Sequence, residues 1–244
     1  MCYSEWNTAS VRDYVRRAAS VENVFLSEFT AETAPAVQFS SNSKLNGVMA
    51  VGLLPGPATC GGACRDCLRG CYAIRHIVGR SAGTLERCAK NTAILKIDRV
   101  GYFRQIDAAA KLCRVFRFHT EGEIIDVDYF VRAVEVARNN PGTQFLMFTK
   151  KHEIVNTYLD NGGTIPANFA LLLSAWYDLN AVNNPHKLPL SAPDFSTAPA
   201  KYRRPFDASG LRVVECGGDC MKCFADRAGC FGAESGDVVR FIAH

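Results

Sequence analysis

The sequence predicts an α/β fold whose mostly parallel sheet curls into a full or partial barrel. Short runs of bulky apolar residues, typical of buried strands, alternate with segments of about 12 residues that have helical periodicity. Such alternation is typical of βαβ units, and right-handed crossovers bend their sheet toward a barrel. With 244 residues, 48% of them hydrophobic, the chain can bury a sizeable core as one large or two small domains.

The elements are predicted in chain order from apolar periodicity and from Gly, Pro and Asn stops. Residues 10–29 can form an amphipathic helix, and residues 40–47 a turn. An apolar run around 47–54, closed by Pro and Gly, predicts a buried strand. Beyond it we expect helices over 84–96, 102–113, 126–140 and 151–163, and strands over 114–123, 143–150 and 167–178. Asp126 or Asp128 is expected near the start of its helix.

The last third of the chain is expected to be less regular. Residues 179–205 hold five of the ten prolines and are interpreted as a long loop, either a lid or a crossing segment. The tail combines a strand, a group of cysteines and a final strand. The predicted organisation is a helical extension over 1–43, a partial (β/α) barrel over 44–210 and a cysteine-rich, metal-binding tail over 211–244.

Composition indicates an ordinary globular protein in a reducing compartment. Charged residues are 21%, and the net charge of +4 permits a polyanionic partner without demanding one. The N-terminal residues lack the apolar region of a secretory signal, and no run of about 18 apolar residues predicts a membrane span. We therefore expect a cytoplasmic protein, in which 11 cysteines indicate metal or redox chemistry rather than disulfides.

Eight cysteines form two groups that share the pattern C-G-G-x-C-x-x-C, each with a fourth cysteine shortly after. Glycine pairs let a loop wrap tightly and turn amide groups toward anionic sulfur. The recurrence of the pattern predicts two metal sites. The first cysteine group is Cys60, Cys64, Cys67 and Cys71, and the second cysteine group is Cys216, Cys220, Cys223 and Cys230. The lone cysteines, Cys2, Cys88 and Cys113, are interpreted as small buried apolar residues.

The spacing favours iron–sulfur clusters over zinc, and two alternatives stay open at each group. Structural zinc prefers paired knuckles from two chain segments, whereas here one short loop supplies three or four sulfurs. The first group could hold a reactive 4Fe–4S cluster with an open iron, or a closed structural metal. The second could hold an auxiliary 4Fe–4S cluster or a structural zinc.

The C-x3-C-x2-C spacing of the first group resembles that of radical S-adenosylmethionine enzymes, which are partial (β/α) barrels. In that family the cluster loop follows the first strand, as the first cysteine group here follows the strand at 47–54. The resemblance implies that three cysteines hold a 4Fe–4S cluster and that S-adenosylmethionine binds the remaining iron. The cluster would then cleave the cofactor to a radical that abstracts hydrogen from a substrate.

The same resemblance nominates residues that would bind the cofactor. The family's next strand ends in a Gly-Gly-Glu-like motif that meets the methionine amino group, and a later strand often ends in a polar residue near the cofactor. The corresponding positions here are Thr120, Glu121, Gly122, Glu123 and Ser174, with Glu121 in place of one glycine. The alternative is a solvated strand end for the two glutamates and a loop serine.

Other polar residues at strand ends are interpreted more simply. His119 is expected to be structural rather than a ligand. Lys150, Lys151 and His152 could contact a carboxylate or phosphate, or form a solvated basic turn.

Residues 54–73, 86–91 and 114–150 resemble the phage "gene product 88" domain family, which looks like a relative of radical S-adenosylmethionine proteins. The Cys-Tyr-Ala segment and the strand "RFHTEGE" carry most of this resemblance, which covers about residues 45–244. The family's aligned cysteines correspond to Cys60, Cys67 and Cys71, whereas the spacing argument selects Cys60, Cys64 and Cys67. A phage-encoded protein would act in the cytoplasm of its host.

The leading hypothesis is an iron–sulfur protein with a radical S-adenosylmethionine-like core, one or two 4Fe–4S clusters, an electron donor and an unknown substrate. No catalytic residue is assigned. The rival hypothesis is a non-enzymatic protein, stapled by iron–sulfur or zinc, that binds nucleic acid or a protein partner. Its support is the mild positive charge and the dibasic pairs Arg16-Arg17, Lys150-Lys151 and Arg203-Arg204, which are scattered rather than gathered in a stripe.

Overall fold

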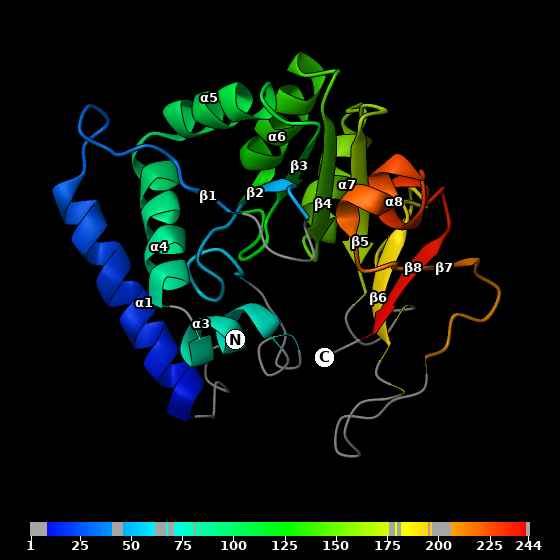
Figure 1. Cartoon of the computed structure of the whole chain (residues 1–244), viewed down its shortest axis with the longest axis horizontal. Helices are drawn as coiled ribbons and strands as arrows, with labels where there is room; N and C mark the ends of the chain where they lie inside the picture. The colour runs from blue at the N-terminus through cyan, green and yellow to red at the C-terminus, as the bar shows by residue number, and fades with distance from the viewer. Residues whose placement is uncertain are drawn as a thin grey trace.

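The structure is a computed structural model that describes residues 9–40, 46–61, 67, 71–80, 82–175, 179, 182–194, 196 and 206–242. It is a mixed α/β fold, shown in Figure 1. The helices of the described residues are α1 (Ala9–Glu28), α3 (Tyr72–Arg80), α4 (Ala82–Ile97), α5 (Arg99–Ala110), α6 (Val127–Asn139), α7 (His152–Asp160), α8 (Cys220–Ala225) and the 3-10 helix η3 (Gly229–Phe231). The strands are β1 (Phe39–Ser40), β2 (Met49–Val51), β3 (Val115–Phe118), β4 (Gln144–Thr149), β5 (Phe169–Ser174), β6 (Leu190–Asp194), β7 (Val213–Glu215) and β8 (Val238–Ile242).

One eight-stranded sheet runs through the molecule in the order β1-β2-β3-β4-β5-β6-β8-β7. Only β1 is antiparallel to its neighbour, and every other neighbouring pair is parallel. Strands β2 to β6 follow chain order, so each crossover adds the next strand at the same edge. The carboxyl ends of these strands therefore meet along one edge of the sheet.

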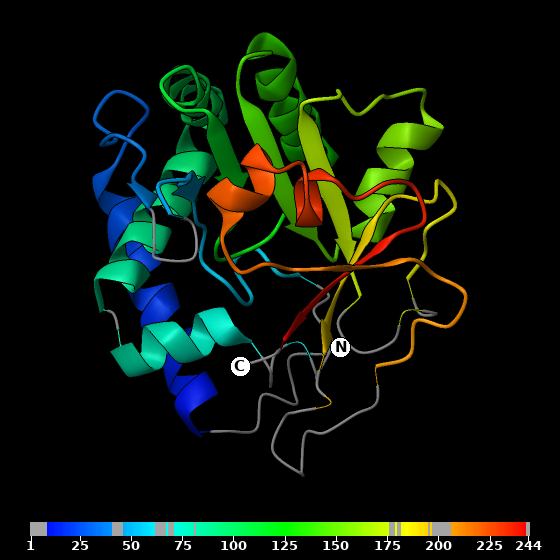
Figure 2. The same ribbon diagram turned by 45° about the vertical axis from the view of Figure 1, so that its right-hand side comes forward.

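The two faces of the sheet are covered differently. The main core packs β2–β6 and β8 against α5, α6 and α7, and it contains the fully buried rings of Phe116, Phe118 and Phe145. On the opposite face, which we call the inner face, α8 and η3 pack over the sheet. Figure 2 shows α8 on the side of the sheet turned away from α6. Helix α1 packs along α4 at one end of the molecule (Figure 1).

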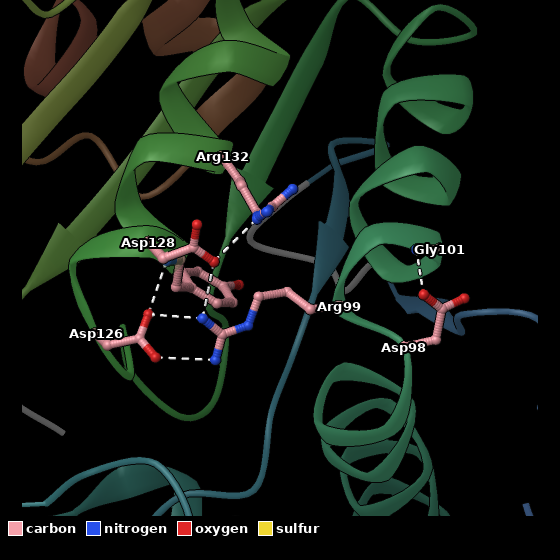
Figure 3. A network of polar contacts seen from close by, with 7 residues as sticks. Asp98, Arg99, Gly101, Asp126, Asp128 and Arg132 are labelled. Atoms are coloured by element: carbon pink, nitrogen blue, oxygen red, sulfur yellow. Dashed lines mark hydrogen bonds and ion pairs between the residues drawn. The ribbon is translucent and has the colours of Figure 1, made fainter. Parts of the chain in front are cut away.

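A polar network fixes the start of α6 beside α5 (Figure 3). The Asp126 carboxylate caps α6 by accepting from the Tyr129 amide at 2.8 Å, which confirms the expected acidic start. Arg99, at the start of α5, donates to Asp126 at 3.0 and 2.9 Å and to Asp128 at 2.9 Å. The capped end of α6 holds in place the loop that follows β3, where the predicted cofactor residues lie.

Each helix and strand predicted before residue 179 has a counterpart, but β2 and β3 are shorter than the strands expected at 47–54 and 114–123, and residues 176–178 of the strand expected over 167–178 lie outside the described residues. The expectation of a loop over the whole of 179–205 is wrong, because it contains the buried strand β6. Within β6, only Leu190 and Ser191 pair with β5. Pro193 therefore lies beyond the end of β5, where its missing N–H breaks no hydrogen bond between these two strands. No described helix has the length and apolar character that crossing a lipid bilayer requires.

Candidate metal and cofactor site

The predicted site residues gather where β2, β3 and β4 end. The Leu53 amide, just after β2, donates to the Glu121 carbonyl at 2.9 Å, and the Thr120 amide donates to the Val51 carbonyl at 3.2 Å. These bonds join the loop that carries the first cysteine group to the loop after β3. The parallel sheet therefore brings the two predicted motifs together at one edge.

Three cysteines of the first group lie within electrostatic range of the Lys150 ammonium. Cys60, Cys67 and Cys71 are half-buried, and Cys64 lies outside the described residues. Burial alone would lower the pKa of Lys150, but the negative charges of Cys67, Glu123, Cys60 and Cys71 outweigh it and raise that pKa. The sulfurs thus lie within electrostatic range of one side chain at the end of β4.

Hydrogen bonds hold Cys60 against the sheet. Its amide donates to the Gly56 carbonyl at 2.7 Å, and the neighbouring Thr59 hydroxyl donates to the Leu54 carbonyl at 2.6 Å. The same hydroxyl accepts from the Glu123 amide at 3.2 Å. Burial, with a smaller contribution from Glu123, raises the pKa of the Cys60 thiol to about 11. A thiol in this environment needs a cation or metal to become a thiolate at neutral pH.

Glu123 is an internal anchor rather than a solvated strand end. Its buried carboxylate accepts from the Thr149 hydroxyl at 2.7 Å and from the Ile124 amide at 2.9 Å through one oxygen. The other oxygen accepts from the Lys150 amide at 2.9 Å. Glu123 therefore ties the end of β3 to the end of β4, which positions Lys150 beside the cysteines.

Glu121 is turned toward α4. Its carboxylate accepts from the Thr120 hydroxyl at 2.5 Å and lies 3.6 Å from the Arg87 guanidinium and 3.8 Å from the Cys88 sulfur. A Cβ atom at Gly52 would lie 2.2 Å from the same carboxylate. These contacts hold α4 against the loop that follows β3, and a contact of Glu121 with a cofactor remains a prediction.

Gly122 occupies a position that only glycine fills without strain. Its φ of +82° lies in the left-handed region, and a Cβ atom there would be 2.7 Å from the Leu53 Cβ.

Ser174 is buried at the end of β5, beside Ser191 of β6. Its carbonyl lies 3.2 Å from the His152 Nε2 atom, and Lys151 donates to the Gly61 carbonyl. Lys151 and His152 thus contact the backbone around the site.

Tyr72 belongs to the site although we did not predict it. Its hydroxyl donates to the Thr120 carbonyl, while its side chain is 55% exposed. It follows Cys71 directly, so it links the first cysteine group to the end of β3. The Cys-Tyr-Ala pattern in the sequence was the signal that could have identified it.

The second cysteine group packs on the inner face of the sheet. Cys216 follows β7, Cys220 and Cys223 lie in α8, and Cys230 lies in η3. Cys220 packs against a small cluster of Val48, Ala50 and Val115, and Cys216 and Cys230 pack against a second cluster of Leu146, Leu172 and Val239. Cys230 has the other three sulfurs within electrostatic range. Burial, then Cys216, Cys220 and Cys223, raise the pKa of its thiol to about 12.

Two glycines leave room for a sulfur in this segment. A Cβ atom at Gly229 would lie 3.1 Å from the Cys223 Sγ atom, and one at Gly217 would lie 3.6 Å from it. The Cys216 amide donates to the Arg240 carbonyl of β8 at 2.8 Å, and Asp219 caps α8. The backbone therefore wraps around Cys223 and is fixed to the sheet at both ends.

The described residues contain no group of three or more His, Cys, Asp or Glu side chains arranged to hold a metal ion. The donor chemistry of both groups still fits iron–sulfur or zinc, because thiolates are the preferred ligands of both. The glycine cradle around Cys223 also fits such a group. The metal assignment is accordingly a proposal.

The remaining histidine and cysteine positions have structural contacts. His119 is buried, its Nε2 atom lies 2.8 Å from the Tyr129 hydroxyl, and its φ is 58°. Burial, together with Arg117, lowers the pKa of His119 to about 3. Cys88 is fully buried, as expected, Cys113 is half-buried, and Cys2 lies outside the described residues.

Comparisons with known proteins give one family. The model of the family described as gene product 88 matches residues 16–228, which include both cysteine groups except Cys230. Searches of curated proteins and of solved structures returned no match. The match covers most of the chain and agrees with the resemblance of the cysteine and β3 segments to phage proteins, so the chain belongs to the gene product 88 family.

Proposed function

We propose that the protein is an iron–sulfur protein with a radical S-adenosylmethionine-like core that cleaves S-adenosylmethionine reductively and abstracts hydrogen from a substrate. The observation that carries the proposal is that hydrogen bonds tie the loop of the first cysteine group to the carboxyl edge of a parallel sheet, where Cys60, Cys67 and Cys71 lie within electrostatic range of Lys150. Ligands and cofactors bind at this edge in open α/β sheets and barrels.

The sheet topology supports the finer fold assignment. Seven of the eight strands, β2 to β8, form a parallel array in which the first cysteine group follows the first parallel strand. This is the connectivity that a partial (β/α) barrel of the radical S-adenosylmethionine type requires. The long connections after β5 and β6 lack a described helix and depart from a regular barrel.

The chemistry divides between the cofactors and the chain. A 4Fe–4S cluster, when bound, would pass an electron from an external one-electron donor to the sulfonium, so that a carbon–sulfur bond breaks, methionine leaves and the adenosyl radical takes a hydrogen atom from the substrate. The chain supplies thiolates for the iron, and Lys150 offsets part of their negative charge. Glu123 and Thr59 keep the cysteine loop on the sheet edge.

The second group is assigned to an auxiliary 4Fe–4S cluster or to structural zinc. Cys216, Cys220 and Cys230 pack on an apolar surface, the other three thiols lie within electrostatic range of Cys230, and Gly217 and Gly229 leave space beside Cys223. Two filled 4Fe–4S sites correspond to about eight irons per chain. Iron near four with one zinc assigns zinc to the second group.

Turnover of S-adenosylmethionine tests the proposal. Protein purified without oxygen should be brown, with absorbance near roughly 400 nm from sulfur-to-iron charge transfer. With dithionite it should convert S-adenosylmethionine to 5′-deoxyadenosine and methionine, measured by chromatography, and Cys60→Ser should abolish this. Cys113→Ser, at a cysteine outside both groups, is the matched control. A colourless protein that carries only zinc contradicts the proposal.

A further inference from the structure

Arg117 is a charged residue on the inner face of the sheet. In β3 the rings of Phe116 and Phe118 pack in the main core, so the alternate residues, Val115 and Arg117, face the other way. Arg117 is paired in register with Ala50 of β2 and Leu146 of β4, which both belong to the inner-face clusters. The guanidinium therefore emerges on the face that the second cysteine group partly covers.

The guanidinium of Arg117 has an aromatic neighbour and an unused donor. It stacks on the Phe148 ring, with 5.1 Å from its central carbon to the ring centroid. Its Nε atom is buried and has no hydrogen-bond partner, and no described carboxylate forms an ion pair with this residue. Buried donors are rarely left without an acceptor, so this atom requires an explanation.

Arg117 lies in β3 between the parts of the sheet that the two cysteine groups contact. Three residues after it, the Thr120 carbonyl accepts from the hydroxyl of Tyr72, the residue that follows Cys71 of the first group. Its neighbours in register, Ala50 and Leu146, belong to the clusters against which Cys216, Cys220 and Cys230 of the second group pack.

We propose that Arg117 binds an oxyanion, a carboxylate or phosphate group, on a ligand that lies on the inner face between the two cysteine groups. A guanidinium that lies over the Phe148 ring and has a free Nε–H donor can bind an oxyanion through two N–H groups in bidentate geometry. The inference deepens the proposed function and rests on it, because it assigns the ligand to the substrate of the same site.

The test uses inorganic phosphate and malonate as separate probes, titrated into full-length protein purified without oxygen and measured by calorimetry. Arg117→Gln should weaken binding of the preferred probe by about tenfold to a hundredfold, the loss of a charge-assisted hydrogen bond. Preference for phosphate or for malonate identifies which oxyanion the ligand carries.

Arg114→Gln is the matched control for Arg117→Gln. Arg114 precedes the same strand and also stacks on an aromatic ring, Phe224 at 5.2 Å, but it is exposed. Its replacement removes the same charge and should leave probe binding unchanged. Arg117→Lys keeps the charge without the planar fork and should bind with intermediate affinity.

Several outcomes overturn the inference. Neither probe binding to the unaltered protein, or equal binding by the Arg117→Gln and Arg114→Gln proteins, excludes the site. If Arg117→Gln does not fold, Arg117→Lys decides, and affinity equal to that of the unaltered protein rejects the bidentate contact. Competition between probe and S-adenosylmethionine, with loss of cofactor binding in Arg117→Gln, assigns the oxyanion to the cofactor and rejects the substrate.

Failure of this inference and failure of the proposed function can be told apart. Probe binding that depends on Arg117, without any cleavage of S-adenosylmethionine, rejects the proposed function and with it the assignment to a radical substrate, while the oxyanion site stands. Cleavage that depends on Cys60, without probe binding that depends on Arg117, rejects the oxyanion site alone.

Discussion

The two cysteine groups share one sequence pattern but lie in opposite environments. The first lies at the carboxyl edge of the sheet among polar and charged residues: Lys150, Glu123 and the hydroxyl of Thr59. The second lies on the sheet face against Leu146, Leu172 and Val239. Arg117 is the charged side chain that acts on Cys230 there.

The comparison indicates that the pattern C-G-G-x-C-x-x-C determines which cysteines are available as ligands, whereas the surroundings determine what the group does. A charged ligand can bind at a polar edge and leave it again, because the charged side chains and backbone groups there interact with the ligand in place of its hydration water. An apolar face gains stability when thiolates are covered by a metal and packed. We therefore expect the first group to serve reaction and the second to serve folding.

The largest expected effect follows from disrupting the second group. The double substitution Cys220→Ser and Cys223→Ser should lower the melting temperature by about 10 °C or more, because metal binding to such a segment contributes folding free energy directly. Calorimetry and metal analysis measure it. Cys113→Ser, at a half-buried cysteine outside both groups, should change neither. Unchanged melting and metal content in the double variant would show that the tail is not a metal site.

Single serine substitutions in the first group should change the cluster more than the fold. If one iron is left for S-adenosylmethionine, three of the Cys60, Cys64, Cys67 and Cys71 variants lose the cluster and one keeps it. The spare cysteine is Cys71 by spacing or Cys64 by family resemblance. Melting should fall by only about 3 °C, since Glu123 and Thr59 still hold the loop.

Iron analysis and electron paramagnetic resonance separate the outcomes of these four substitutions. The spectrum of the reduced, unaltered protein should change when S-adenosylmethionine is added, because a new ligand on one iron alters the electronic structure of the cluster. If all four variants lose the cluster and S-adenosylmethionine leaves the spectrum unchanged, the first group is a structural metal site in which all four cysteines are ligands.

Glycine substitutions test the cradle around Cys223. Gly229→Ala should cost about 2 kcal/mol of unfolding free energy, because its φ is +53° and the new Cβ would lie 3.1 Å from the Cys223 sulfur. Gly218→Ala, with φ +78° and open space around it, should cost about 1 kcal/mol from backbone strain alone. Gly142→Ala, without either feature, should stay within about 0.5 kcal/mol of the unaltered protein. Denaturant titration ranks the three, and equal values for Gly229→Ala and Gly218→Ala would argue against close packing around this sulfur.

Much of the fold could be predicted from the sequence, because the apolar runs of β3, β4 and β5 and the periodicity of α4 to α7 agree with their packing. β6 was missed because Pro193 and the prolines on either side of the strand imitate a loop, and Pro193 is accommodated on the β5 side because the pairing with β5 ends at Ser191. No local pattern in the sequence shows where the pairing between two strands ends.

The candidate site was predicted less completely than the fold. Parallel topology brought Cys60 and Glu123 together as expected, but the side chain of Glu121 turned to Arg87 and Cys88, which lie on a different helix. Arg117 was overlooked, although a single charge within the run "VFRF" of a buried strand is itself a signal. The direction in which it points depends on the register of three strands.

The last expected effect depends on pH and concerns His119, at the strand end that joins the site to the main core. Its pKa is lowered from 6.5 to about 3, chiefly by burial, so the folded protein keeps it neutral while the unfolded chain protonates it below about pH 6.5. Between these values the unfolded state binds more protons, and stability must fall as the pH falls, by up to about 1.4 kcal/mol per pH unit. The stability that neutral His119 contributes is fully present above pH 6.5 and absent below about pH 3.

Asparagine can adopt the φ of 58° found at this position and does not titrate. The unfolding free energy of His119→Asn should therefore fall less steeply between pH 6.5 and pH 5. Chemical denaturation at several pH values measures both slopes, and equal slopes would mean that His119 titrates alike in the folded and unfolded states. A reduced slope would show that the folded protein keeps His119 neutral at the β3 end, because burial there disfavours the protonated ring.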